Sequence, residues 1–407
     1  MRTLKMKSAV WGGGLLMVLF VAGCSASPST RTAEPAPANP PTAVVVPTPS
    51  EEPPPPATEE PADTAAPVEE SAAAMSVSPN VSTFASGFLA PRGLKFGPDG
   101  YLYVAEGGVG GETETMGTCE GFTSMFAPFH IGMSARVSRV DADGNRTTVV
   151  ENLPSFQDQF GDVIGVSDTL FIDDTLYAIV SGGGCSRGFE DFPASVVEVL
   201  DDGTVKAVAD LSDFYTNHPA AAGNEADFEP DGTANAIVEH DGSLYILNAN
   251  HGGLDVVTLD GQIRRLLDFT ATEGHVTPDT MVLRDGNFYI GTLSKFPIVP
   301  GTAKVYMVTP DGDLSVYAEG LTAVVSIAFD EDGRLYALEA SNVEAEYPPP
   351  GAGRVVRIGE SGELEEIATG LSFPSGMVFG PDGELYVSHF SYGGDPANGE
   401  IVRIDVP

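Results

Sequence analysis

The segment Phe96-Gly97-Pro98-Asp99-Gly100-Tyr101-Leu102-Tyr103 combines an apolar strand end, an Asp-Gly turn and an aromatic second strand. Five further segments repeat this order with an Asp-Gly-like turn, at residues 170–177, 238–245, 282–289, 329–336 and 379–386. Asp-Gly pairs suit the positive φ angles that tight hairpins require. Hairpin units that recur at intervals of roughly 40 to 50 residues indicate a β-propeller, in which each unit forms one blade.

A second turn follows the first in five of the units. These turns are Asp143-Gly144, Asp202-Gly203, Asp260-Gly261, Asp311-Gly312 and Ser361-Gly362. Each joins a third strand to a fourth, and four antiparallel strands make one propeller blade. The sequence therefore predicts an all-β fold, a six-bladed β-propeller over residues 79–407.

The sixth unit is one strand short, because the chain stops at Pro407 soon after the third strand of this unit. Residues 86–93 align with residues 369–376, which join an outer strand of the fifth blade to the inner strand of the sixth. By this register, residues 81–85 form an outer strand with no blade of its own. We expect this N-terminal strand to complete the sixth blade and close the ring, which removes an open sheet edge.

The first 23 residues have the organisation of an export signal. Basic residues precede an apolar run over residues 9–22, which is shorter than the roughly 20 residues that cross a bilayer. The run leads into Val21-Ala22-Gly23-Cys24, which resembles the bacterial lipoprotein signal, in which the cysteine is lipidated and becomes the mature N-terminus. We therefore expect Cys24 to anchor the protein on the extracytoplasmic side of the bacterial cell membrane, with plain secretion or a retained helix as the alternatives.

Residues 24–78 are rich in Pro, Ala, Thr and Glu and poor in large apolar side chains. This composition cannot offset the entropy lost on folding, so a disordered tether is expected. The formal net charge of the chain is −38, which repels phosphate and argues against nucleic acid as a partner. The expected partner is a protein or a carbohydrate, and the expected state is a monomer.

The first three units carry long insertions, at residues 107–135, 182–194 and 212–233. In a propeller these connections lie on one face, which we expect to carry the function. Cys119 and Cys185 fall in the first two insertions; in an exported protein they predict a disulfide, with two unpaired thiols as the alternative. The acidic cluster that ends at Asp231 is expected to be solvated, as most acidic loops are.

Two sets of positions, taken in register across the units, are predicted to ring the central channel at this face. Oxygen donors stand at four of these positions, Asn235, Asp279, Glu106 and Glu339. Such oxygens suit a hard cation such as Ca²⁺ or Mg²⁺. His389 and Asn248 add polar groups that could contact a ligand. The alternative is that these side chains only hydrogen-bond to neighbouring strand ends and to channel water.

Sequence patterns of common catalytic sites are absent. The six histidines form neither a His-x-x-x-His nor a His-Glu-x-x-His pattern, which argues against a zinc site. No Gly-x-Ser-x-Gly segment occurs, so a serine hydrolase of the α/β type is not supported. No catalytic residue and no organic cofactor can be assigned.

Residues 87–108 and their repeats, residues 224–232, Asn235 and Gly252-Gly253 resemble the ScyD/ScyE family. These are exported, NHL-like six-bladed propellers named for a pigment biosynthesis cluster. The resemblance implies a ligand- or protein-binding module and supplies no catalytic residues. Asn235 and Asp279 also occupy places comparable to metal-binding positions of calcium-dependent sugar lactonases, another six-bladed group. A metal-dependent lactonase- or lyase-like enzyme is therefore the alternative.

Overall fold

The structure is a computed structural model that describes residues 76–222 and 228–407. The predicted signal sequence, nearly all of the predicted tether and the predicted lipidation site Cys24 lie outside these residues. No helix within the described part of the chain is long and apolar enough to span a membrane.

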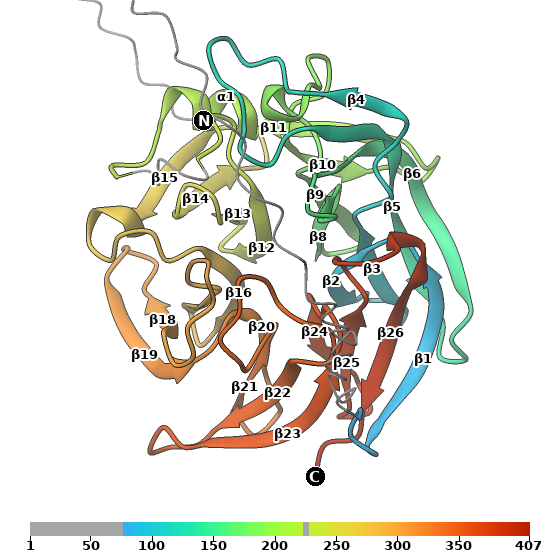
Figure 1. Cartoon of the computed structure of the whole chain (residues 1–407), viewed down its shortest axis with the longest axis vertical. Helices are drawn as coiled ribbons and strands as arrows, with labels where there is room; N and C mark the ends of the chain where they lie inside the picture. The colour runs from blue at the N-terminus through green and yellow to red at the C-terminus, as the bar shows by residue number, and fades with distance from the viewer. Residues whose placement is uncertain (1–75, 223–227) are drawn as a thin grey trace, which may run out of the picture. The chain divides into compact units, whose positions relative to one another are not determined.

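The described strands form six antiparallel sheets arranged around a central axis, which confirms the predicted six-bladed propeller (Figure 1). Blade 1 contains β2 (Pro91–Phe96), β3 (Leu102–Glu106), β5 (Phe129–Val140), β6 (Arg146–Gln157) and β7 (Val163–Ile164), with β4 (Thr113–Thr115) paired to β5. Blade 2 contains β8 (Val166–Ile172), β9 (Thr175–Val180), β10 (Ser195–Val199) and β11 (Val205–Asp210). Blade 3 contains β12 (Ala234–His240), β13 (Ser243–Asn248), β14 (Gly253–Thr258) and β15 (Ile263–Asp268).

The second half of the ring repeats the four-stranded pattern. Blade 4 contains β16 (Pro278–Arg284), β17 (Asn287–Thr292), β18 (Ala303–Val308) and β19 (Leu314–Leu321). Blade 5 contains β20 (Val324–Phe329), β21 (Leu335–Glu339), β22 (Gly353–Ile358) and β23 (Leu364–Leu371). Blade 6 contains β24 (Met377–Phe379), β25 (Leu385–His389), β26 (Gly399–Ile404) and β1 (Val81–Phe88). Helix α1 (Leu211–Asn217) and the 3₁₀ turns η1 (Cys185–Arg187), η2 (Phe269–Ala271) and η3 (Pro396–Asn398) lie in connections.

Strand β1 closes the ring, as the sequence predicts. It is the outer strand of blade 6 and pairs antiparallel with β26 from Val81 opposite Ile404 to Phe88 opposite Gly399. The side chain of Asn80 also donates hydrogen bonds to the carbonyl oxygens of Ile367, at 3.1 Å, and Asp405, at 2.9 Å. The two ends of the propeller are therefore joined within a single sheet.

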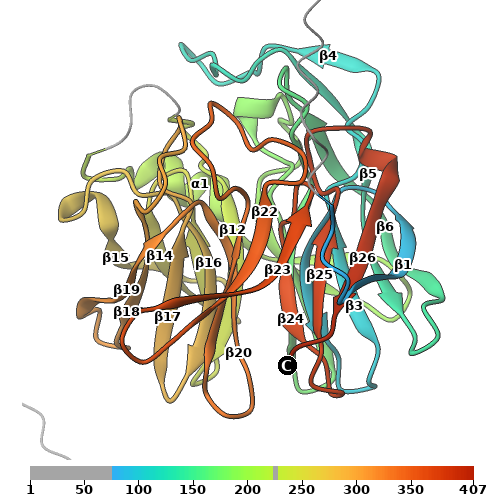
Figure 2. The same ribbon diagram turned by 60° about the horizontal axis from the view of Figure 1, so that its bottom comes forward.

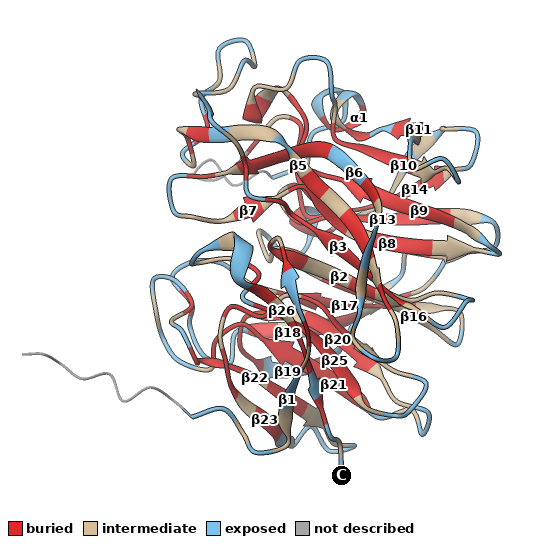
Figure 3. Ribbon diagram, turned by 90° about the vertical axis from the view of Figure 1, so that its right-hand side faces the viewer, coloured by how far each residue is buried: buried red, intermediate tan, exposed pale blue. Residues whose placement is uncertain are grey.

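The tyrosine of the repeated segment packs against the neighbouring blade. Tyr103 of blade 1 meets Phe171 of blade 2 with ring centroids 4.8 Å apart, in an edge-to-face arrangement. Tyr386 of blade 6 meets Phe96 of blade 1 in the same way, at 5.4 Å, so the contact continues around the closure. Apolar clusters fill each junction between adjacent blades, and Figure 3 shows buried residues along the strands with exposed residues at the turns.

Turn chemistry explains why Asp-Gly pairs mark two of the hairpins. Asp241 and Gly242 both have positive φ, 50° and 73°, the combination that a two-residue type I′ turn needs. Asp285 and Gly286 repeat this geometry at 50° and 76°. An aspartate tolerates this backbone region better than most residues and glycine adopts it freely.

The three insertions contact one another on one side of the ring. β5 and β6 are twelve residues long each, more than twice the length of β3, because the first insertion continues the hairpin beyond the blade. Figure 2 shows β4 and the end of this hairpin above the other blades. We refer to residues 107–135, 182–194 and the described part of 212–233 together as the cap.

Candidate functional site

The inner strands of the six blades line a cavity of about 500 Å³. These strands are β2, β8, β12, β16, β20 and β24. Asn235 and Asp279 line the cavity from the second positions of β12 and β16, close to the loop-bearing face. Small or polar residues stand at the corresponding places of the other blades, namely Gly93, Ser167, Ser326 and Gly376.

Asn235 and Asp279 contact each other directly. The amide Nδ2 of Asn235 donates a hydrogen bond to Oδ1 of Asp279 over 2.5 Å. Burial raises the pKa of Asp279 to about 6, although the hydrogen bond from Asn235 and the charge of Arg92 act in the opposite direction. This carboxyl group can therefore gain or lose a proton close to neutral pH.

Arg92 brings a positive charge to the same end of the channel. Its guanidinium donates to Oδ1 of Asp162 over 2.6 Å and to the carbonyl oxygen of Val163, which ties β2 to the turn before β7. It also interacts electrostatically with Asp279. Neither Arg92 nor Asp162 is among the residues predicted from sequence. The sequence contained one signal for Arg92: in the alignment of residues 86–93 with residues 369–376, this arginine stands opposite Ser375.

Two tyrosines from long loops complete this end of the channel. Tyr392 lies in the loop after β25. Burial raises the pKa of its hydroxyl, and the charges of Asp162, Arg92 and Asp279 act on it as well. Tyr347 lies in the loop after β21 and interacts with Asp162 and Arg92. We call Arg92, Asp162, Asn235, Asp279 and Tyr392 the channel-mouth cluster. It offers a guanidinium, carboxylates, an amide and a phenol to a polar ligand.

Glu106 and Glu339 do not line the cavity with Asn235 and Asp279, contrary to the predicted ring. Glu106 is fully buried and accepts from the backbone N–H of Leu89, at 2.6 Å, and from Arg136, at 2.8 Å. Glu339 is fully buried in the same role, with the N–H of Thr322 at 2.6 Å and Nε of Arg354 at 2.5 Å. Each stands at the end of the second strand, where it satisfies the connection that enters its own blade.

Asn248 and His389 occupy the same register position and also lie outside the cavity lining. Oδ1 of Asn248 accepts from the backbone N–H of Thr233 at 3.2 Å. Nε2 of His389 accepts from the N–H of Ser372 at 2.7 Å, and its Nδ1 lies 2.7 Å from Glu400. This hydrogen bond holds the pKa of Glu400 below its usual value. The alignment of the repeats correctly placed these residues at the ends of second strands. In each sheet, however, the second strand lies one strand further from the channel than the inner strand.

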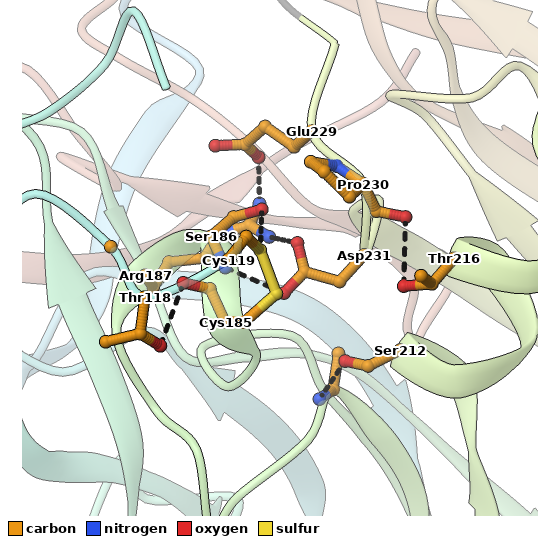
Figure 4. Close-up of a disulfide and its surroundings, with 12 residues drawn as sticks. Thr118, Cys119, Cys185, Ser186, Arg187, Ser212, Thr216, Glu229, Pro230 and Asp231 are labelled. Carbon is orange, nitrogen blue, oxygen red and sulfur yellow. Dashed lines mark hydrogen bonds and ion pairs between the residues drawn. A yellow bond between two sulfur atoms is a disulfide. The ribbon is translucent and has the colours of Figure 1, made fainter. Parts of the chain in front are cut away.

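The cap contains the predicted disulfide and a buried ionic cluster (Figure 4). Cys119 and Cys185 are bonded, with Cα atoms 4.8 Å apart, so the free-thiol alternative is wrong. Arg187 is 1% exposed and pairs with Glu229 and, at 3.0 Å, with Asp231. Burial raises the pKa of Glu229, with Arg187 opposing this rise. Glu229 and Asp231 were expected to be solvated. They are buried instead, because Arg187 in the second insertion supplies a cation for both.

Stability should depend on pH through Asp279. Its pKa in the folded state lies well above the ordinary value of 3.8, so the folded state binds the proton more tightly than the unfolded chain, and its contribution to stability falls as pH rises from 4 to 6. A rise of about two pKa units corresponds to at most about 3 kcal/mol. Asp279→Asn should therefore show a smaller loss of unfolding free energy between pH 4.5 and 7.5 than the wild type, measured by urea denaturation.

The pH dependence of Asp279→Asn is compared with that of the wild type because other groups also titrate in this pH range and change the free energy of unfolding. Burial lowers the pKa of His251 to about 4, which contributes in the opposite sense. Asp241→Asn is the matched control, since the Asp241 side chain is 91% exposed. Equal pH dependence in the wild type and Asp279→Asn would contradict the prediction.

Comparisons with known proteins find similar solved structures but no related sequence. No model of a protein family matches the sequence, and no curated protein sequence matches it. A Bacteroides thetaiotaomicron protein of unknown function superposes with a TM-score of 0.50 at 12% identity, over 80% of this chain and 75% of that chain. A Xanthomonas campestris gluconolactonase superposes with a TM-score of 0.48 at 12% identity, over 80% of this chain and 89% of that chain. A virginiamycin B lyase from Staphylococcus aureus superposes with a TM-score of 0.44 at 13% identity, over 80% of this chain and 99% of that chain.

The TM-score of 0.50 at 12% identity shows similarity of fold alone and transfers no activity to this chain. The chain is a six-bladed β-propeller protein with a closed ring and a disulfide-bonded cap.

Proposed function

We propose that this protein is a lipid-anchored, extracytoplasmic binding module of the ScyD/ScyE type, held at the bacterial cell membrane through Cys24. Its ligand is a protein or carbohydrate group that enters the channel from the loop-bearing face. The protein acts as a monomer, does not bind nucleic acid and catalyses no reaction. The observation that carries the proposal is the channel-mouth cluster, in which Arg92, Asn235 and Asp279 line one cavity from three blades and Asp162 pairs with Arg92.

A binding screen tests this proposal. Purified protein would be melted with a panel of soluble oligosaccharides and peptides, because a ligand that binds only the folded state raises the melting temperature. We expect at least one compound to raise it by about 2 °C or more. The rise should disappear in Asn235→Ala and in Asp279→Ala and persist in Asp241→Asn, at the opposite end of the blades. A rise that survives both channel variants would place the ligand elsewhere.

A metal-dependent lactonase- or lyase-like enzyme is the second candidate. The observation in its favour is the pair of oxygen donors, Asn235 and Asp279, on adjacent inner strands. Their chemistry fits a Ca²⁺ or Mg²⁺ ion only in part, because the other two predicted oxygen donors, Glu106 and Glu339, accept hydrogen bonds outside the channel. The pair itself supplies one carboxylate, that of Asp279, and one amide. The positive charge of Arg92 acts on Asp279 as well, which disfavours a second cation there.

Metal content separates the two candidates. Under the binding-module proposal, EDTA should change the melting temperature by less than about 1 °C, and elemental analysis should find no stoichiometric cation. A bound cation that is lost in the Asn235→Ala/Asp279→Ala double variant, together with several degrees of stability, would instead support the enzyme.

A further inference from the structure

A row of aromatic side chains lies on the loop-bearing face beside the channel-mouth cluster. The rings of Phe296 and Tyr347 are nearly parallel, with an angle of 18° and centroids 6.2 Å apart. Tyr347 then meets Tyr392 edge-on at 6.0 Å, and Tyr392 meets Phe373 at 5.4 Å. We call these four residues the aromatic row. It crosses from the loop after β17, through those after β21 and β25, to the connection before β24.

The outer end of the row is open to solvent, and its inner end is buried. Phe296 is 49% exposed and Tyr347 is 37% exposed, whereas Phe373 is 8% exposed. A contiguous exposed apolar surface of this kind on a soluble domain commonly marks a binding site. The aromatic row therefore offers exposed rings at Phe296 and Tyr347.

The loops that carry the exposed rings are fixed to each other. An isolated β-bridge joins Ile298 to Ala345, with hydrogen bonds of 2.8 and 3.3 Å in the two directions. The Ile298 side chain is 3% exposed and packs with Ala323 and Ala340 beneath the bridge. Rings held in this way lose little conformational entropy when a ligand covers them.

The two tyrosines in the middle of the row lie near hydrogen-bonding groups. Tyr392 interacts electrostatically with Asp162, Arg92 and Asp279, and Tyr347 interacts with Asp162 and Arg92. Neither tyrosine hydroxyl has a hydrogen-bond partner among the described residues. Both remain available to a ligand, next to a guanidinium and carboxylates that suit paired donors and acceptors.

We infer that the ligand is an oligosaccharide, which lays its apolar C–H faces on the aromatic row and turns its hydroxyl groups toward the channel-mouth cluster. This inference rests on the proposed function and names its ligand class. Sugar rings combine an apolar face with an edge of vicinal hydroxyls, and aromatic faces next to carboxylate, amide and guanidinium groups match both. A peptide is the competing occupant, and the experiment below separates it.

Charge restricts the kind of sugar. Glu344, Glu346 and Asp395 are exposed in the loops that carry the row and outnumber the exposed Lys295, and the charges of Asp162 and Asp279 act on Tyr392. These carboxylates repel uronic acids and phosphorylated sugars. The ligand is therefore a neutral or amino-sugar oligosaccharide.

Isothermal titration calorimetry with defined oligosaccharides tests the inference. The probes are cellohexaose and chitohexaose as neutral chains, a chitosan hexamer as an amino-sugar chain, and a hexamer of galacturonic acid as an acidic chain. We expect one or more of the first three to bind and the acidic hexamer not to bind. Phe296→Ala and Tyr347→Ala should each weaken binding about tenfold or more, whereas Tyr347→Phe, which keeps the ring face, should retain most of the affinity.

Tyr317→Ala is the matched control. Tyr317 is 47% exposed and packs edge-on against Tyr289 at 4.9 Å, but it lies on the outer strand β19, away from the row. Its loss should change the affinity by about twofold or less. Melting temperatures of all variants would show that each one is folded.

The outcomes distinguish this inference from the proposed function. If no oligosaccharide binds, or if Tyr347→Ala binds as the wild type does, the inference is overturned. Should a peptide bind instead and lose affinity in Asp279→Ala, the saccharide inference fails and the proposed function stands. Saccharide binding that depends on Tyr347 and is unaffected in Asn235→Ala and Asp279→Ala supports the aromatic row and overturns the channel site.

Discussion

A chain that lacks residues 79–88 should fail to unfold cooperatively. The deletion removes β1, and with it the whole ladder to β26 and the fully buried Phe88. The deletion also removes the ring of Phe84, whose centroid lies 5.0 Å from the ring centroid of Tyr386. Burial of each large apolar side chain contributes about 1.5 to 3 kcal/mol, and a domain is typically stable by only about 5 to 15 kcal/mol. The combined loss should therefore exceed about 5 kcal/mol.

Circular dichroism on heating measures this effect, because a propeller with an open ring should lose its sharp transition. The control is deletion of residues 26–75, most of the predicted tether, which should change the melting temperature by less than about 2 °C. A closure deletion that melts within a few degrees of the wild type would show that the ring does not need β1.

Arg187→Met should lower the free energy of unfolding by about 3 to 5 kcal/mol at pH 7.5. The variant leaves Glu229 and Asp231 buried without their cation, and both carboxylates are no more than 5% exposed as side chains. The hydrogen bond from Arg187 to Thr233, at 2.7 Å, is also lost. Removal of one partner from a buried pair is costly because the remaining charge has lost both water and its counterion.

Lys206→Met is the matched control for this variant. Lys206 pairs with Glu198 at 2.8 Å, but its side chain is 65% exposed, and exposed pairs contribute about 0 to 1 kcal/mol. The penalty of Arg187→Met should be smaller at pH 5, because the raised pKa of Glu229 allows protonation to remove its charge. Urea denaturation at both pH values measures these differences. A loss below about 1 kcal/mol at pH 7.5 would mean that the cluster is hydrated or rearranges.

Local patterns account for the parts of the site that were predictable. Each blade repeats a similar turn and the same tyrosine, so the register of the repeats is enough to place Asn235 and Asp279 at the heads of two inner strands. The same register placed Glu106 and Glu339 one strand further out. Side chains at that position face the connection between blades and satisfy its backbone N–H groups. Periodicity reveals equivalent positions, but it does not reveal which neighbour a side chain meets.

The sequence alone predicted the number of blades and the closing role of β1, because both depend on repeats and turn chemistry. It also predicted a disulfide between Cys119 and Cys185 from the shared face of two insertions, with two unpaired thiols as the alternative. Only the tertiary structure brought Arg92 to Asp162, Arg187 to Asp231 and Phe296 to Tyr347. These contacts join loops that differ in length and sequence from blade to blade. Their partners are chosen by how the ring packs, which no local pattern encodes.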